Sequence, residues 1–227
     1  MVKLKKVLVL SFCILFCFSF FIGCSHAKTQ GLEEYLSELR TDTFFGQTDT
    51  LKLKAHYGFK ETPYDNDSKV MQKRYYLSFI LPEAIDFNAE YRVEFSFNGV
   101  NYSDKFLHNP TNDRLSVSFE IENFDLKSFD VKISKASDIV NVNLVSLLPK
   151  DTISYVNALS CLVKNQKELI DSYYDQNGRF TAEIRMKVLV KDNKSYWYVG
   201  FCTAKGGLKA LLVDGLSGQV LAIREVF

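Results

Sequence analysis

The middle of the chain alternates regularly between apolar and polar residues. The alternation occurs in residues 51–57, 91–98, 115–122 and 129–134. Successive side chains of a β-strand point to opposite faces, so a period of two indicates strands with one face in a core and one in water. Such strands are typical of antiparallel sheets. These segments therefore predict an antiparallel β-rich region.

Further signals complete this β-rich region. Asn98-Gly99 lies between two alternating runs and predicts a two-residue hairpin, because both residues tolerate a positive φ. More apolar runs at 75–81 and 140–148 add two strands. Six or seven strands at this spacing predict a β-sandwich of immunoglobulin-like architecture. The Cys–Trp–Cys core of antibody domains is absent, so this likeness concerns architecture alone.

Helical periodicity flanks this region on its N-terminal side. Leu32, Tyr35, Leu36 and Leu39 recur at intervals of three and four residues. This spacing predicts a short amphipathic helix over residues 31–40.

Helical periodicity returns after Pro149. Asp151 can cap a helix, apolar residues continue at helical spacing from 153 to 173, and Asn177-Gly178 can end it. Strands are predicted near 184–190, 195–202, 208–213 and 219–227. The fold class expected is thus α+β, with a C-terminal helix packed on a four-stranded antiparallel sheet.

The first residues indicate export. A short basic segment with Lys3, Lys5 and Lys6 precedes an apolar run from Val7 to Ile22. This run is shorter than the roughly 20 residues that cross a bilayer. A basic start followed by a short apolar core is typical of a secretory signal peptide.

Ile22-Gly23-Cys24 ends the apolar run and resembles the lipobox of bacterial lipoprotein precursors. The resemblance implies cleavage before Cys24, attachment of a diacylglyceryl group to its thiol, and anchoring at the outer face of the cell membrane. Phe21 departs from the pattern, which usually has Leu there. Two alternatives remain: an uncleaved N-terminal anchor helix, or cleavage after Ala27 with loss of Cys24.

Four regions follow from these signals. We expect a signal peptide at 1–23, a lipidated tether at 24–31, a short helix plus the β-sandwich at 32–149, and the α+β region at 150–227.

The last region also resembles the PepSY domain of secreted peptidase propeptides. The resemblance is carried by Tyr196-Trp197-Tyr198-Val199 and by Val213-Asp214-Gly215-Leu216-Ser217-Gly218-Gln219-Val220-Leu221. Ser217 and Gly215 replace the commoner Thr and Ala. The resemblance implies binding, and restraint, of a secreted or cell-wall peptidase. The sequence Asp-x-x-Ser-Gly also suits any hairpin turn that begins with a capping Asp and ends with Gly. The alternative is therefore that this region and the PepSY domain have a similar shape without common ancestry.

Composition and motifs argue against several classes of function. Lys plus Arg is 28 against 27 for Asp plus Glu, which leaves no overall basic field for nucleic acid. The three His residues form no zinc pattern, and phosphate-binding or dinucleotide-binding glycine motifs are missing. The sequence therefore predicts no catalytic residue, metal or cofactor, and leaves the oligomeric state open. Cys161 and Cys202 are either a disulfide or two small buried side chains.

Adjacent aromatic residues provide the remaining candidate site. Neighbours in a strand face opposite sides, so one of Trp197 and Tyr198 could be exposed and contact a partner. The alternative is that both faces of the sheet are covered. We expect a non-catalytic lipoprotein that acts as a protein-interaction module at the cell envelope. A glycan-binding or peptide-binding module, or an enzyme of unrecognised type, are the alternatives.

Overall fold

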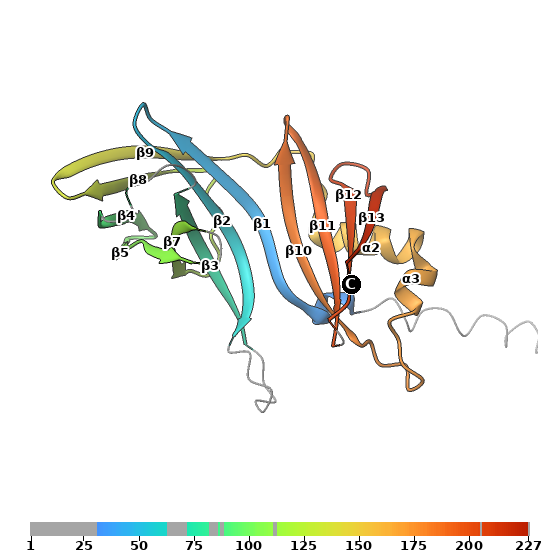
Figure 1. Ribbon diagram of the computed structural model, residues 1–227. Helices are drawn as coiled ribbons and strands as arrows, with labels where there is room; N and C mark the ends of the chain where they lie inside the picture. Colours follow the sequence, from blue (N-terminus) through green and yellow to red (C-terminus); the bar gives the residue numbers. More distant parts are fainter. Residues whose placement is uncertain are drawn as a thin grey trace, which may run out of the picture. The chain divides into compact units, whose positions relative to one another are not determined.

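The computed structural model describes residues 31–62, 72–81, 86, 89–110, 113–204 and 206–226 (Figure 1). The predicted signal peptide, Cys24 and nearly all of the predicted tether lie outside these residues. The chain divides into two compact units, 1–34 and 35–227. Of the first unit only residues 31–34 are described, and a 3₁₀ helix, η1 (Leu32–Tyr35), begins there. Among the described residues, no helix has the length and apolar character needed to cross a membrane.

The second unit is built on strands, with two helices between β9 and β10. In chain order the elements are β1 (Leu36–Gln47), β2 (Lys52–Thr62), β3 (Gln72–Leu81), β4 (Tyr91–Phe97), β5 (Val100–Lys105), β6 (Leu107–Asn109), β7 (Arg114–Glu120), β8 (Ser128–Lys135), β9 (Asp138–Ser146), α2 (Tyr155–Asn165), α3 (Lys167–Asp171), β10 (Ala182–Lys191), β11 (Lys194–Thr203), β12 (Leu208–Asp214) and β13 (Val220–Val226). The predicted α+β class is confirmed.

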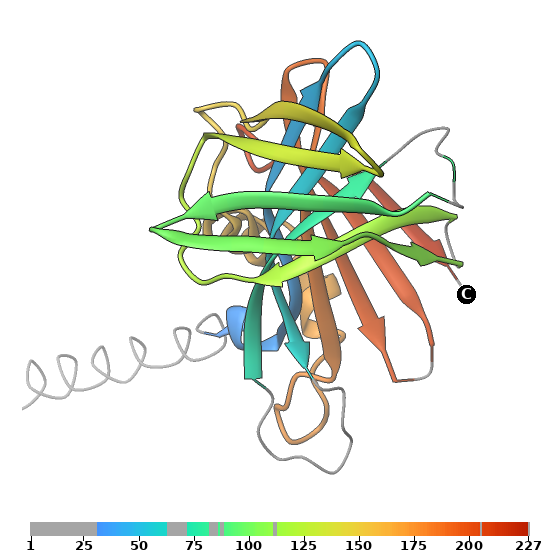
Figure 2. The same ribbon diagram turned by 90° about the vertical axis from the view of Figure 1, so that its left-hand side faces the viewer.

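All of these strands join one sheet, which is nearly closed at one end. Its main path runs β13-β12-β11-β10-β1-β2-β3-β7-β6, and β9, β8, β4 and β5 continue from β1 in that order. The β1–β10 pair is parallel, and the other strand pairs are antiparallel. Figure 2 shows β4, β5, β8 and β9 lying across β1, β2 and β3. The sheet thus folds over itself and encloses a core.

Aromatic side chains fill this core. Phe79 packs against Phe95 and Phe129, with ring centroids 5.2 and 6.3 Å apart, and Phe44 meets Phe124 edge-on at 5.8 Å. All five are nearly inaccessible to solvent. Phe95 and Phe129 occupy apolar positions of the alternating segments, so the period of two predicted the burial of these two correctly.

The two helices accompany the C-terminal strands (Figure 1). Ser154, rather than the predicted Asp151, caps α2, and its hydroxyl accepts a hydrogen bond of 3.2 Å from the amide of Asn157. The predicted continuous helix is interrupted at Gln166. Helix α2 buries Ala158, Leu159 and Leu162, which lie on the apolar stripe.

The helix predicted over 31–40 is limited to the 3₁₀ helix Leu32–Tyr35, and its second half is wrong because β1 begins at Leu36. The helix-like spacing of Leu36 and Leu39 arises from β-bulges, in which one extra residue shifts the alternation of side chains. The register of β1 shifts between Leu36 and Glu38 against β10, and between Arg40 and Asp42 against β2. Leu36 and Leu39 are both buried although they are three residues apart.

Strand β1 also determines how the predicted regions connect. It lies within the predicted region 32–149, yet it pairs with β10 of the region 150–227, for example Leu39 with Met186. Backbone hydrogen bonds therefore run continuously from the N-terminal strands into the C-terminal strands.

Candidate ligand-binding groove

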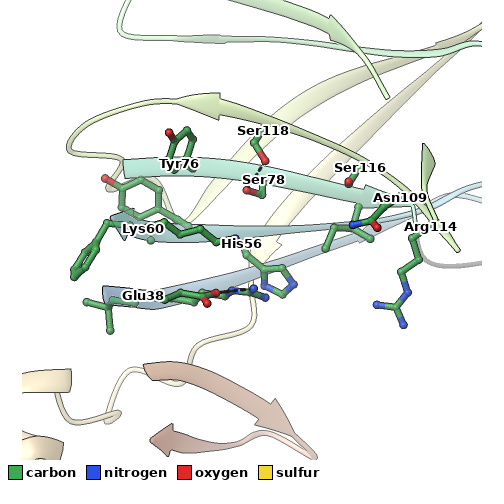
Figure 3. A pocket seen from close by; sticks show the side chains of 15 residues that line it. Glu38, His56, Lys60, Tyr76, Ser78, Asn109, Arg114, Ser116 and Ser118 are labelled. Carbon is green, nitrogen blue, oxygen red and sulfur yellow. Dashed lines mark hydrogen bonds and ion pairs between the residues drawn. The ribbon is translucent and has the colours of Figure 1, made fainter. Parts of the chain in front are cut away.

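The face of the sheet opposite the aromatic core carries the polar members of the alternating segments. On β2, His56, Gly58 and Lys60 alternate with buried Tyr57 and Phe59. The neighbouring strands contribute Arg40, Tyr76, Ser78, Ser116 and Ser118 to the same face. These side chains line a cleft of about 400 Å³ (Figure 3).

A second cleft of about 220 Å³ adjoins the first over β10 and β11. Its lining includes Arg185, Lys187 and Tyr198, and it shares Glu38 and Arg40 with the first cleft. The β1–β10 pairing explains this continuity, since it places Glu38 opposite Arg185 and Arg40 opposite Lys187. We call the two clefts together the groove.

A close backbone approach shapes the floor of the groove. Gly58 lies opposite Arg40, next to the bulge in β1. A Cβ atom on Gly58 would come within 1.8 Å of the Leu39 carbonyl oxygen and 2.7 Å of the Arg40 Cα. Only glycine permits this approach, which places Arg40 between the two clefts.

Positive charge dominates the lining. Five cationic side chains face one carboxylate, that of Glu38; the cations are Arg40, Lys60, Arg114, Arg185 and Lys187. Among the described residues, no carboxylate forms an ion pair with Lys60, Arg114 or Lys187. The Nζ atom of Lys187 instead lies 4.7 Å from the centroid of the Tyr198 ring, a cation–π contact.

The two arginines at the centre of the groove are paired. Nη2 of Arg40 lies 2.8 Å from Oε1 of Glu38, and Nε of Arg185 lies 2.9 Å from Oε1 of Glu183. Partial burial alone would raise the pKa of the Glu183 carboxyl. Hydrogen bonds from Arg185 and Ser37 outweigh it and hold the pKa below its ordinary value. Glu183 therefore stays ionised and keeps Arg185 in place.

His56 lies in the middle of this charge. Its Nδ1 is 3.0 Å from the Thr43 hydroxyl. Burial, and then the charges of Arg40, Lys54 and Lys187, lower its pKa from the ordinary 6.5 to about 4. The imidazole is thus neutral at physiological pH, and the potential around it is positive.

Hydroxyl groups form a row along the first cleft. The Ser78 and Ser118 hydroxyls are hydrogen-bonded at 2.8 Å, and Ser116 follows along the row (Figure 3). Tyr76 and Asn109 add a phenol and an amide. Together with the cations, these groups can donate hydrogen bonds to a polar, negatively charged ligand.

Elsewhere in the described part of the chain, no group of three or more His, Cys, Asp or Glu side chains lies close enough to hold a metal ion. The neutral His56 imidazole and the cations and hydroxyl groups around it can form hydrogen bonds and charge pairs with a ligand.

The structure separates the two predicted contact residues. Trp197 is only 2% exposed, and its Nε1 donates a hydrogen bond of 3.0 Å to the carbonyl of Ile153, so its ring belongs to the core and cannot contact a partner. Tyr198 points to the other face and lines the groove, half-buried beneath Lys187. Cys161 and Cys202 are free thiols, so the disulfide alternative is not realised.

Most of the groove was not anticipated from the sequence. Its residues were noted only as the polar partners of apolar strand positions. A signal existed, because the polar positions of β2 carry Lys54, His56 and Lys60, while those of β3 and β7 carry Ser78, Ser116 and Ser118. The pairing that brings β10 beside β1 could not be inferred from it.

Comparisons with protein-family models, curated proteins and solved structures gave no match for this chain. The groove is therefore interpreted from its own geometry and chemistry.

Proposed function

We propose that this chain is a non-catalytic, extracytoplasmic binding protein, and that the groove holds an extended polar ligand at the cell envelope. One observation carries the proposal. A continuous sheet face across β7, β3, β2, β1, β10 and β11 is lined by hydroxyl groups and by cations, three of which lack a carboxylate partner among the described residues. A surface that served only stability would gain little from concentrating like charges.

Photo-crosslinking in cells tests this proposal. A photo-reactive amino acid replaces Ser118, which is exposed beside the first cleft, and in a control it replaces Asn141, which is exposed on β9. We expect envelope material to crosslink at position 118 and not at position 141. Equal labelling, or none at position 118, would show that the groove is not the binding site.

The location rests on the lipobox resemblance. We propose that Cys24 becomes the lipidated N-terminus and anchors the protein through its acyl groups, since two acyl chains hold a protein stably on a bilayer. Mass spectrometry of the mature protein should find a diacylglyceryl group on Cys24, and Cys24→Ala should release the protein from membranes. A mature end at another position would contradict this anchoring.

A protein partner is the second candidate, and the edge of the sheet favours it. Within the described part of the chain, strand β13 pairs with β12 alone, so its other edge can accept an added strand, and Leu221 and Ile223 on it are each 49% exposed. The PepSY resemblance proposes a secreted peptidase as that partner. Inhibition of co-exported peptidases by the full chain would support it, and a proline at Ile223 should abolish the inhibition.

The finer architecture is also proposed. We propose an immunoglobulin-like sandwich for the N-terminal strands and a PepSY-like unit for β10–β13 with α2. Two strand layers around an aromatic core support the first. The Asp214–Gly218 turn supports the second; it follows β12, the strand that pairs with the Trp197 strand β11.

A further inference from the structure

We infer, on the basis of the proposed binding function, that the ligand of the groove is an anionic polysaccharide that lies along β2 and β3. The inference assigns a chemical class to the occupant. It rests on three properties of the lining: the sign of its charge, the distance between its cations, and the nature of the groups between them.

The charge requires an anionic occupant. Lys60, Arg114 and Lys187 have no carboxylate partner among the described residues, and Glu38 is already engaged by Arg40. Clefts lined by one sign of charge focus the electric field and attract ligands of opposite sign. Arginine and lysine donors also form stronger hydrogen bonds with charged acceptors than with neutral ones.

The spacing of the cations indicates an extended chain instead of a single small anion. Lys60 and Arg114 lie at opposite ends of the labelled row in Figure 3, with Ser78, Ser116 and Ser118 between them. Lys60 pairs with Arg74 of β3, and Leu115, the neighbour of Arg114, pairs with Leu81, so the two cations lie seven residues apart along β3, which corresponds to about 23 Å of strand. Lys187 reaches the same face from β10. One ligand that engages all of these cations must carry several negative charges along its length.

The groups between the cations favour a sugar polymer over an acidic peptide. Serine hydroxyls, the Tyr76 phenol and the Asn109 amide line the first cleft between its charged ends. These groups match the many hydroxyls of a glycan. A peptide would gain most from strand addition or from apolar pockets, but β2 and β3 are already paired on both sides. The floor of the groove therefore offers a peptide no free backbone partner.

Fluorescence anisotropy with a labelled oligogalacturonate tests this inference on the full chain in detergent. We expect binding that weakens as salt is added, because exposed charge contacts are screened. Lys187→Gln and Arg114→Gln should each weaken binding by about fivefold, the value of one partly exposed charge contact. Lys132→Gln, on β8 outside the groove, is the matched control and should leave the affinity unchanged.

Each alternative outcome overturns the inference in a recognisable way. Equal affinity for an uncharged oligogalactoside would show that charge does not select the ligand. Binding of a polyglutamate peptide in place of oligogalacturonate would assign the groove to acidic peptides. Both of these results would leave the proposed binding function intact. Absence of binding together with absence of crosslinking at position 118 would overturn the function as well.

Discussion

His56 makes the stability of the protein dependent on pH. Its pKa is about 4 in the folded chain, because burial and the charges of Arg40, Lys54 and Lys187 disfavour the imidazolium, and 6.5 is the ordinary value expected after unfolding. Between these values the unfolded chain binds more protons, so stability falls as the pH drops from 6.5 to about 4. The full contribution is about 3 kcal/mol.

Urea denaturation across this pH range measures the effect. The variant His56→Gln cannot titrate, so its stability should fall less steeply than that of the natural protein over the same interval. Parallel curves for the two proteins would mean that His56 is not held neutral in the groove.

At Gly58, the backbone of β1 comes too close to leave room for a side chain. The change Gly58→Ala would place a Cβ 1.8 Å from the Leu39 carbonyl oxygen, so β1 or β2 must move. We expect a loss of about 3 kcal/mol in the free energy of unfolding, at the upper end of overpacking costs. Urea denaturation measures the loss.

Gly99 provides the matched control. It has φ +77° and nothing within 4 Å of its added Cβ, so Gly99→Ala adds backbone strain without a clash. This variant should lose about 1 kcal/mol. A Gly58→Ala variant as stable as Gly99→Ala would contradict the close approach of β1 and β2.

At the scale of elements, the turn between β12 and β13 depends on one carboxylate. Oδ1 of Asp214 accepts hydrogen bonds from the amides of Leu216 and Ser217 and from the Ser217 hydroxyl. The hydrogen bond from the Ser217 amide, then that from its hydroxyl, lower the pKa of Asp214 below its ordinary 3.8. The same turn brings Gly218 against Cys161 of α2.

Asp214→Ala should therefore lower the free energy of unfolding by about 1 kcal/mol. Hydrogen exchange should increase in β13 more than in β10, because the turn holds the edge strand. Asp130→Ala, which removes a carboxyl that accepts one side-chain hydrogen bond from Asn143, is the control and should have a smaller effect. Unchanged exchange in β13 would show that the strand does not depend on this turn. The carboxylate's contribution is present above the ordinary pKa and is lost as the pH falls through the lowered value.

The elements that could be predicted from the sequence are those set by local contacts. The alternation around Phe95 and Phe129 predicted buried strands, and Asn98 and Gly99 adopt the positive φ that their hairpin requires. The segment around Leu36 and Leu39 was predicted as a helix but forms a strand, because bulges in a strand reproduce helical spacing. Burial of Trp197 depended on which face of β11 the helix covers, and strand periodicity alone does not specify that.

The groove could not be predicted for a similar reason. Arg40 and Lys187 belong to strands far apart in the chain, and they come together only through the parallel pairing of β1 with β10. No hydrophobic period encodes that pairing, because it results from how the whole sheet closes. The polar residues of each strand could be recognised in the sequence, but it did not show that they share one face of the sheet.

At the scale of the whole molecule, β1 connects the N-terminal strands to the C-terminal strands. It pairs with β2, β9 and β10, and its buried Asp42 accepts hydrogen bonds from Lys127 at 2.9 Å and from the Ser146 hydroxyl at 2.6 Å. Neither the N-terminal strands β2 and β9 nor the C-terminal strand β10 can lose β1 without exposing a strand edge. We therefore expect residues 35–227 to unfold in a single cooperative transition.

Two probes on the same chain test this expectation. The single Trp197 reports on the C-terminal sheet, since its ring is buried on β11 and bonded to the carbonyl of Ile153, whereas far-ultraviolet circular dichroism reports on all strands. The two urea curves should coincide. In Asp42→Ala, the Lys127 ammonium can be solvated again, because its side chain is 71% exposed. The substitution should therefore lower the free energy of unfolding by about 2 kcal/mol and shift both curves equally. Separate midpoints, or a shift confined to circular dichroism, would mean that the two halves unfold independently and that β1 transmits no stability to the sheet beneath α2.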